Sequence, residues 1–186
     1  MIEFSRVKDA AALAVGLVNT WDTFSRDPEG LRDVGALRGL LRFYERPDLA
    51  EAVAVRDTSR ARELRTRLRR AFEADGEEAA VETLNEILLR AGAPPQLVGS
   101  SGRWSYRYHD RDAPPIEVLA ATTSFALLDV IRTGGSARLG FCAAGPCRCV
   151  FVDRSRNRSR RYCCQLCADR AAQTAFRRRR RARRQA

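Results

Sequence analysis

The chain has 186 residues, 45% of them hydrophobic, which is enough for one domain with a core and a small appendage. It contains no run of about 18 apolar residues and does not begin like a secretory signal, so we expect a cytosolic protein without a membrane partner. The net charge of +11 is unevenly spread: residues 141–186 carry +12 and the 140 residues before them carry −1. This asymmetry predicts a near-neutral body and a basic appendage with a polyanionic partner.

The first half of the chain has the periodicity of helices. Apolar residues three and four positions apart predict helices over 9–20, about 34–44, 57–74 and 77–91, and Pro47 opens a further short one. In the long helix of 57–74 the leucines face inward and the arginines, including Arg65, mostly face solvent. These elements predict a helical body.

The pattern then changes to short strands. Residues 96–98 and 104–108 are predicted to form two strands joined by a turn over 99–102. A last helix of the body should run from 112 to about 132, and the glycines after it place a domain junction near residue 138. We therefore expect an α+β fold: a mostly helical N-terminal domain with a small β-hairpin over 1–138, and a second domain over 139–186.

Three polar or aromatic residues stand out at the end of the first helix. Asn19, Thr20 and Trp21 are candidates for the corner of a ligand pocket, which would make the front domain a sensor of a small-molecule effector. The competing interpretation, which we favour, is that Asn19 and Thr20 satisfy free backbone groups at a helix end. The chain has one histidine, no phosphate-binding glycine loop and no HExxH motif, so we predict no enzymatic activity and no catalytic residue.

All six cysteines lie between Cys142 and Cys167, and such clustering in a reducing compartment predicts a metal site. A structural Zn²⁺ ion needs four tetrahedral ligands, usually delivered as two close pairs, here Cys142-x4-Cys147 and Cys163-x3-Cys167. The spacing alone leaves open whether Cys149 replaces Cys147 and whether Cys164 replaces Cys163.

The segments around the cysteines have a recognisable order. Gly145-Pro146 supplies a tight turn between the first pair, 150–152 is predicted to be a strand, and a helix should run from Gln165 to about 183. Residues four apart share one face of a helix, so Cys163 and Cys167 can point at one ion. A knuckle, a strand and a helix that carries the second pair make a treble-clef-like zinc finger.

Arginines dominate the same region. Each phosphate that an arginine neutralises releases condensed counterions, so the segment predicts nucleic-acid binding. The charge leaves RNA possible, and DNA as the expected partner depends mainly on the family resemblance given below. Base reading is expected from the final helix, through Gln165 or Gln173. The candidate contacts are Arg154, Arg156, Arg158, Arg160, Arg161, Arg170, Arg177, Arg178, Arg179, Arg180 and Arg181.

The sequence from Cys142 to Arg170 resembles the CGNR zinc-finger family. The matching features are Cys142-x4-Cys147, the run Phe151-Val152-Asp153-Arg154-Ser155-Arg156-Asn157-Arg158-Ser159-Arg160-Arg161-Tyr162-Cys163, and Cys167-Ala168-Asp169-Arg170. The front half is similar to the ABATE domain that precedes this finger in the family, through Leu17-Val18-Asn19-Thr20 and the Leu84-Asn85 helix followed by a Trp-containing hairpin. The signature Cys-Gly-Asn-Arg keeps only its Cys and Arg here, the last pair is one residue tighter, and Cys164 is extra.

The resemblance implies a function and a ligand set. It implies a bacterial transcription regulator linked to stress, associated with the nucleoid, and it implies Cys142, Cys147, Cys163 and Cys167 as the zinc ligands. A competing class is a redox-responsive zinc protein that acts through protein contacts, because thiol–disulfide chemistry can use the same cysteines. The sequence predicts no DNA target, effector, sign of regulation or oligomeric state.

Overall fold

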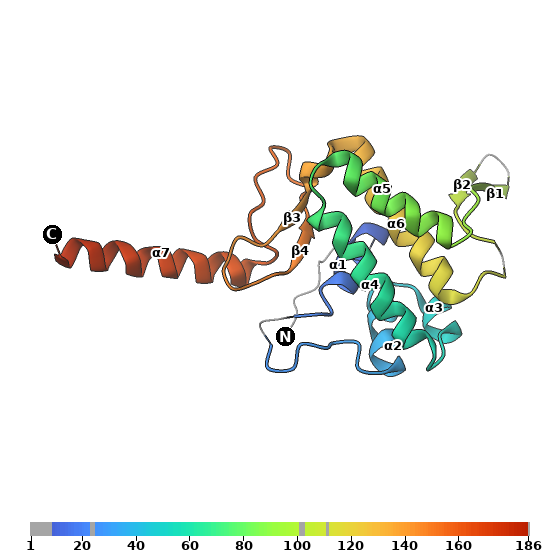
Figure 1. Cartoon of the computed structure of the whole chain (residues 1–186), viewed down its shortest axis with the longest axis horizontal. Coiled ribbons are helices and arrows are strands. Elements are labelled where there is room, and N and C mark those ends of the chain that lie inside the picture. The colour runs from blue at the N-terminus through green and yellow to red at the C-terminus, as the bar shows by residue number, and fades with distance from the viewer. Residues whose placement is uncertain (1–8, 23–24, 101–102, 111, 186) are drawn as a thin grey trace.

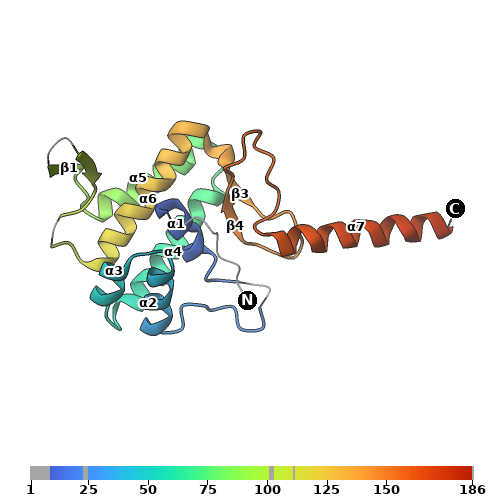
Figure 2. The same cartoon turned by 180° about the vertical axis from the view of Figure 1, so that it is seen from behind.

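The computed structural model describes residues 9–22, 25–100, 103–110 and 112–185. It shows a helical body from which a single long helix projects at one end and a small β-hairpin at the other (Figures 1 and 2). The elements of the body are α1 (Ala10–Val18), α2 (Val34–Phe43), α3 (Pro47–Ala52), α4 (Asp57–Glu73), α5 (Glu77–Arg90), β1 (Gln96–Ser100), β2 (Arg103–Arg107) and α6 (Pro115–Gly134). The rest is a 3₁₀ turn η1 (Ser136–Arg138), the strands β3 (Leu139–Phe141) and β4 (Val150–Val152), and α7 (Gln165–Gln185).

Helix α1 is the centre of the body. Every residue from Ala11 to Val18 is buried, because the helix is apolar all round and α2, α4, α6 and β4 pack around it. Small residues let its neighbours approach closely: a Cβ atom on Gly16 would lie 2.4 Å from the ring of Tyr44. Asp9 begins the helix by accepting a hydrogen bond from the Ala12 N–H at 2.8 Å.

The α+β fold class predicted from the sequence is confirmed, and so is the inward face of α4, where Leu64, Leu68 and Phe72 are buried. The expectation for Arg65 is wrong, because this arginine is buried rather than facing solvent. Its guanidinium forms a two-pronged ion pair with Glu29 at 2.7 and 2.8 Å and also donates to the Thr20 hydroxyl. A paired guanidinium can be buried where a free one cannot.

Two small antiparallel sheets complete the fold. Strands β1 and β2 pair from Gln96↔Arg107 to Ser100↔Arg103, so β1 includes the Gly99 and Ser100 that we had placed in the turn. The remaining turn residues, Ser101 and Gly102, lie outside the described part of the chain. Strand β3, which the sequence did not predict, pairs with β4. Among the described residues no helix combines the length and the apolar character needed to span a membrane.

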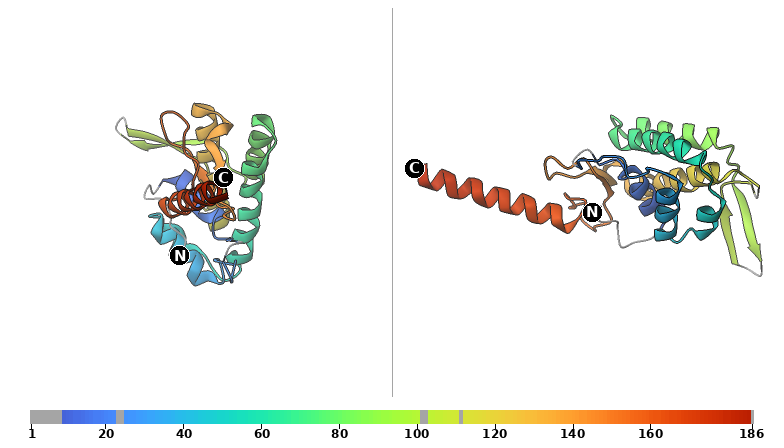
Figure 3. Two further views of the ribbon diagram at one scale, coloured as in Figure 1. Left: turned by 90° about the vertical axis from the view of Figure 1, so that its left-hand side faces the viewer. Right: turned by 90° about the horizontal axis from the view of Figure 1, so that it is seen from below.

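Sheet β3–β4 packs into the body. Val150 and Val152 are buried in the same hydrophobic core as the helices α1 to α6, whereas the cysteine cluster has a small core of its own. The finger is therefore docked on the body through β4 rather than joined to it by a linker. Helix α7 extends away from the finger and the body (Figures 1 and 3).

Candidate metal centre and nucleic-acid interface

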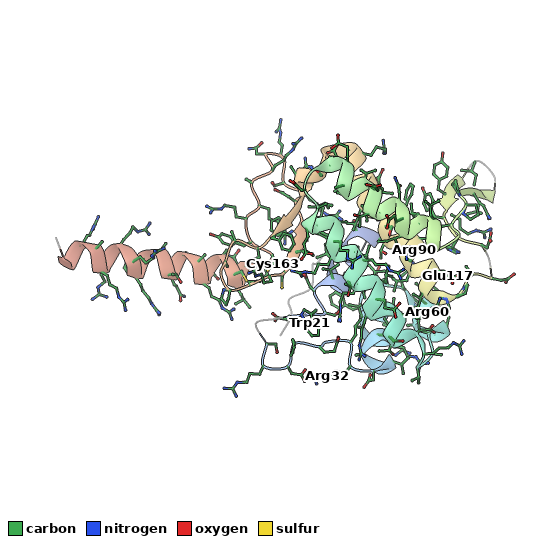
Figure 4. All side chains as sticks on the ribbon, viewed as in Figure 1. Trp21, Arg32, Arg60, Arg90, Glu117 and Cys163 are labelled. Carbon is green, nitrogen blue, oxygen red and sulfur yellow. The ribbon has the colours of Figure 1, made fainter. Side chains whose placement is uncertain are left out.

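Two segments far apart in the finger bring four cysteines together. Cys142 and Cys147 lie in the turn between β3 and β4, and this turn is closed by the hydrogen bond from the Cys142 N–H to the Cys149 carbonyl at 2.9 Å. Cys163 precedes α7, and Cys167 lies in its first turn. Figure 4 shows Cys163 at the point where α7 leaves the body.

The spacing of the sulfur atoms fits a zinc ion. The four Sγ atoms of Cys142, Cys147, Cys163 and Cys167 all lie within 4.8 Å of one another. Cys163 Sγ is 3.8 Å from Cys147 Sγ and 3.7 Å from Cys167 Sγ. Zn–S bonds of about 2.3 Å in a tetrahedron place neighbouring sulfurs about 3.8 Å apart, so the cluster has the dimensions of a four-thiolate zinc site.

Two cysteines remain beside this cluster. The pKa of the Cys149 thiol is lowered to about 7, chiefly by its interaction with the Cys163 thiol, and Cys164 packs at the edge of the small core that the ligand cysteines form with Ala144 and Ala171. Neither belongs to the group of four that can hold a metal ion, as far as the described residues show. All six cysteines are free thiols in this structure.

Three of the four thiols of the cluster ionise less readily than a free thiol. Burial raises the pKa of Cys147 and raises that of Cys167 to about 11. For Cys163 the hydrogen bond with Cys149 is the largest cause of a raised pKa, followed by burial. Burial also opposes ionisation of Cys142, but hydrogen bonds from the Cys163 and Ala144 backbone outweigh it and lower the pKa. Zinc binds thiolates, so it must displace the protons that the raised pKa values retain.

We therefore predict that zinc affinity falls steeply with acidity. The pKa is raised for three of the four thiols, so at least about three protons should leave per zinc bound. Zinc binding should then weaken by about 10³-fold or more for each pH unit between 8 and 6. Titration calorimetry in buffers of different ionisation enthalpy counts the released protons, and a release of fewer than one would contradict this expectation.

Asp153 organises the loop between the two cysteine pairs. Its side chain is buried and accepts hydrogen bonds from the backbone N–H groups of Ser155 at 2.7 Å and Arg160 at 3.0 Å. Burial alone would raise the pKa of Asp153, but these bonds and the Ser155 hydroxyl hold it below its usual value. The carboxylate thus holds together the two ends of the arginine-rich loop, at Ser155 and Arg160.

The loop arginines divide into two groups. The guanidinium of Arg160 donates to the carbonyls of Tyr162 at 3.0 Å and of Cys163, and it stacks 5.0 Å from the centre of the Phe151 ring. Arg154 forms an ion pair with Asp9 at 2.6 Å. These two candidate DNA contacts are occupied within the protein, so the structure gives them a role in holding the finger together.

The remaining loop arginines are available to a partner. Arg156 and Arg158 are exposed and have no side-chain partner among the described residues, and Arg158 adopts a left-handed backbone conformation with φ of 50°. Arg161 lies over the ring of Tyr162, 5.9 Å from its centre, and is also exposed. The candidate contacts Arg177 to Arg181 lie on α7, all exposed, and Arg170 lies nearer its base.

Asn19 connects the body to the finger. Its side-chain amide donates to the Val150 carbonyl at 2.9 Å, and its side-chain oxygen accepts from the Val150 N–H at 2.8 Å. Asn19 is thus bonded to β4 as a neighbouring strand would be, and both partners are buried. The sequence left two interpretations of Asn19, a pocket residue or a residue at a helix end. Asn19 does end α1, but its side chain hydrogen-bonds to Val150, which lies 131 residues later in the chain.

The other two pocket candidates also contact the protein itself. The Thr20 hydroxyl donates to the Leu17 carbonyl at 2.6 Å, and the Trp21 ring lies 5.3 Å from the Arg65 guanidinium carbon. Figure 4 shows Trp21 on the chain that follows α1. A ligand pocket at these residues remains a prediction.

Further contacts fix the finger on the body. Arg138 donates to the carbonyls of Asp153 and Ser155, both at 2.8 Å. From α4, Arg69 donates to the Arg148 carbonyl at 3.3 Å and lies over the Phe141 ring. Together with Asn19 and the Arg154–Asp9 pair, they connect the base of the finger to α1 and α4.

Comparison with known families gives two matches that cover most of the chain. Residues 11–134 match the ABATE family, described as "putative stress-induced transcription regulator". Residues 138–180 match the CGNR zinc finger, which agrees with the four-cysteine cluster described above. A comparison with curated proteins gave no match. The family resemblance read from the sequence is confirmed: the chain belongs to the ABATE family of transcription regulators and carries a CGNR zinc finger after the ABATE domain.

Proposed function

We propose that this protein binds DNA through its zinc finger and thereby regulates transcription. Zinc holds the base of α7 through Cys163 and Cys167, and Cys142 and Cys147 complete the ligand set. The observation that carries the proposal is the placement of charge: residues 141–186 carry +12, and their exposed arginines lie on α7 and on the loop before it. A surface of this kind neutralises phosphates and releases counterions.

The division of the loop arginines supports the same proposal. Arg154 and Arg160 serve the fold, whereas Arg156 and Arg158 project from a loop whose shape is fixed by Asp153. Exposed guanidinium groups on a fixed backbone bind phosphate without first losing conformational freedom in the loop. We assign them, with the arginines of α7, to the DNA interface.

The ABATE domain would regulate DNA binding by the finger. We propose that residues 1–138 sense a small-molecule effector or mediate assembly, and that a change there reaches the finger at 139–186 through β4. The protein would act without catalysis, in the cytoplasm and at the nucleoid. RNA remains the alternative partner.

Salt-dependent binding to duplex DNA tests the proposal. With about seven phosphate contacts, the affinity of the zinc-loaded protein should fall by 10³- to 10⁵-fold between 50 and 200 mM salt. Replacing Arg156 and Arg158 by Gln should lower the slope of log K against log salt by about 1.8, which corresponds to two phosphates. Fluorescence anisotropy with a labelled duplex measures both quantities.

The control variant removes the same number of positive charges from the surface of the body. Arg42 and Arg70 are exposed in α2 and α4, and the double Gln variant should keep the slope of the unaltered protein. An equal loss in both variants would mean that binding follows total charge rather than this surface. A flat salt response would contradict the proposal.

A redox-responsive zinc protein is the second candidate function. It is favoured by Cys149, a further thiol two residues from Cys147, whose pKa is lowered to about 7, chiefly by its interaction with the Cys163 thiol. Such a protein would act through protein contacts, so it predicts zinc loss with disulfide formation on treatment with peroxide, and no specific DNA site.

A further inference from the structure

The outer part of α7 is exposed as far as the described part of the chain shows. Residues 172–183 are all exposed, and the helix extends straight from the finger into solvent (Figures 1 and 3). Only its first turns pack, where Cys167 and Ala171 join the cysteine cluster. Among the described residues nothing covers this rod of helix, so a partner can approach it from every side.

Arginines occur on all sides of this rod. With about 3.6 residues per turn, Arg177 and Arg181 lie on one side of the helix, and Arg179 and Arg183 lie on the opposite side. Arg178 and Arg180 point to the two sides between them. Figure 4 agrees, because the side chains of α7 extend both above and below its axis.

Binding to a flat polyanionic surface does not require arginines on all sides of a helix. A helix that docks along one DNA strand, or on the surface of an acidic protein, needs its cations in a stripe on one face, and the cations on the far face would remain unpaired in solvent. The major groove of DNA is different, because phosphates form both of its walls and base edges form its floor.

We propose, on the basis of the DNA-binding function above, that α7 lies within the major groove of B-form DNA. The arginines on its two opposite sides then contact the phosphates of the two strands, and those between them face the bases or solvent. Bidentate contact with guanine O6 and N7 is the commonest specific arginine contact in this groove. The proposal is thus more specific than general phosphate binding. It names the groove that α7 enters, the helical form of the nucleic acid and the arginines that face the bases.

The dimensions of the rod fit this groove. An α-helix with its side chains is about 10–12 Å across, and the major groove is about 12 Å wide. The twelve exposed residues from 172 to 183 extend about 18 Å, which corresponds to about five base-pair steps. The major groove of A-form RNA is too narrow and deep to be read in this way, so the geometry favours DNA over duplex RNA.

Two matched double variants test the placement of the helix. One replaces Arg177 and Arg181 by Gln, and the other replaces Arg179 and Arg183; each removes two charges four residues apart from one side of α7. Within the groove both sides contact phosphate, so each variant should lose roughly 10- to 100-fold in affinity at 0.1 M salt. The Arg42 and Arg70 double variant is the control for charge alone.

Competitors identify the groove. Binding of the full-length zinc protein to a labelled 20-base-pair duplex should be reduced by methyl green, which occupies the major groove, and not by netropsin, which occupies the minor groove. A duplex RNA of the same sequence should bind at least about 10-fold more weakly in the same salt. Far-UV circular dichroism of each variant checks that its helices are intact.

Each outcome separates the two proposals. Equal losses in both variants, displacement by methyl green and weak RNA binding support α7 in the major groove. DNA binding that depends on one side of α7 only, that netropsin displaces, or that is equally tight for RNA overturns this placement and leaves DNA binding standing. A zinc protein that binds no duplex DNA at any salt overturns the proposed function itself.

Discussion

Replacing Cys167 by Ser is expected to abolish stoichiometric zinc binding. Cys167 is one of the four clustered cysteines, it is buried, and its Sγ lies 3.7 Å from that of Cys163. A structural zinc ion contributes about 10–16 kcal/mol to the folding of a small finger. Loss of a residue that merely supports a ligand already costs 10- to 100-fold in metal affinity, so loss of a ligand should cost at least about 100-fold. Metal analysis of the purified variant and competition with a chelator measure this change.

The matched control is Cys164→Ser. Cys164 lies three residues before Cys167 and packs at the edge of the same small core, but it is not one of the four clustered thiols. This variant should keep close to one zinc per chain. Zinc retention in both variants would show that the ligand set is wrong, and loss in both would assign Cys164 to the metal.

The zinc-free variant should also lose DNA affinity. Cys167 belongs to the first turn of α7, and residues 172–183, beyond Ala171, are all exposed. Without zinc the helix loses its attachment, while its charge is unchanged. Affinity should therefore fall although the arginines remain, which a purely electrostatic interaction of the chain with DNA would not predict.

Replacing Asn19 by Asp is expected to release the finger from the body. The amide of Asn19 donates to the Val150 carbonyl and accepts from the Val150 N–H. A carboxylate cannot donate, so the variant would place one acceptor against another in a buried site and bury an unpaired charge. We expect a loss of about 3 kcal/mol in the free energy of unfolding, measured by denaturant titration of the zinc-loaded protein. Hydrogen exchange at the Val150 amide should accelerate in parallel.

The pH dependence of this variant has a definite sign. Burial without a partner raises the pKa of the new carboxyl above its unfolded value, and the protonated form can donate to the carbonyl as the amide does. The loss of stability should therefore be largest at neutral pH and shrink as the pH falls toward the pKa of the unfolded carboxyl. The control is Asn85→Asp, an exposed position of α5, which should change stability by less than about 0.5 kcal/mol. Equal stability of the Asn19→Asp and Asn85→Asp variants would show that the two bonds to Val150 do not hold the finger.

Much of the helical body could be predicted from the sequence because its signals are local. Leu64, Leu68 and Phe72 recur at the spacing of one helix face, and the structure buries all three. The paired spacing of Cys142–Cys147 and Cys163–Cys167 likewise depends on short-range geometry, and the structure brings these four thiols together. Period and spacing are properties that a single chain displays before it folds.

Features that depend on distant segments were missed. Strand β3 has three residues, and its central Gly140 has no side chain to show a pattern; a Cβ there would lie 2.6 Å from the Phe151 ring on the paired strand. The partner of Asn19 is 131 residues away, so no local pattern points to it. The boundary near residue 138 stays a prediction, but Val150 and Val152 complete the core of the body.

Charge patterns were the least decisive signal at the level of single residues. Arg154, Arg156, Arg158 and Arg160 alternate along the loop and look equivalent in the sequence. The fold separates them, because Arg160 finds backbone carbonyls and an aromatic ring while Arg156 projects into solvent. The sequence did contain a signal for the residue that organises this loop, because Asp153 is one of only two acidic residues after 140. A buried carboxylate must be hydrogen-bonded, and Asp153 accepts from two backbone N–H groups of the loop.

The attachment of α7 at one end only makes the helix a lever arm. Its 21 residues extend about 31 Å from the cysteine cluster, so a tilt of about 10° at the base moves the far end by about 5 Å, more than the 3.4 Å between neighbouring base pairs. The base is connected through β4 to α1 by Asn19 and to η1 by Arg138. If α7 lies on DNA as proposed, a small displacement of this base would change the register of the helix on the DNA.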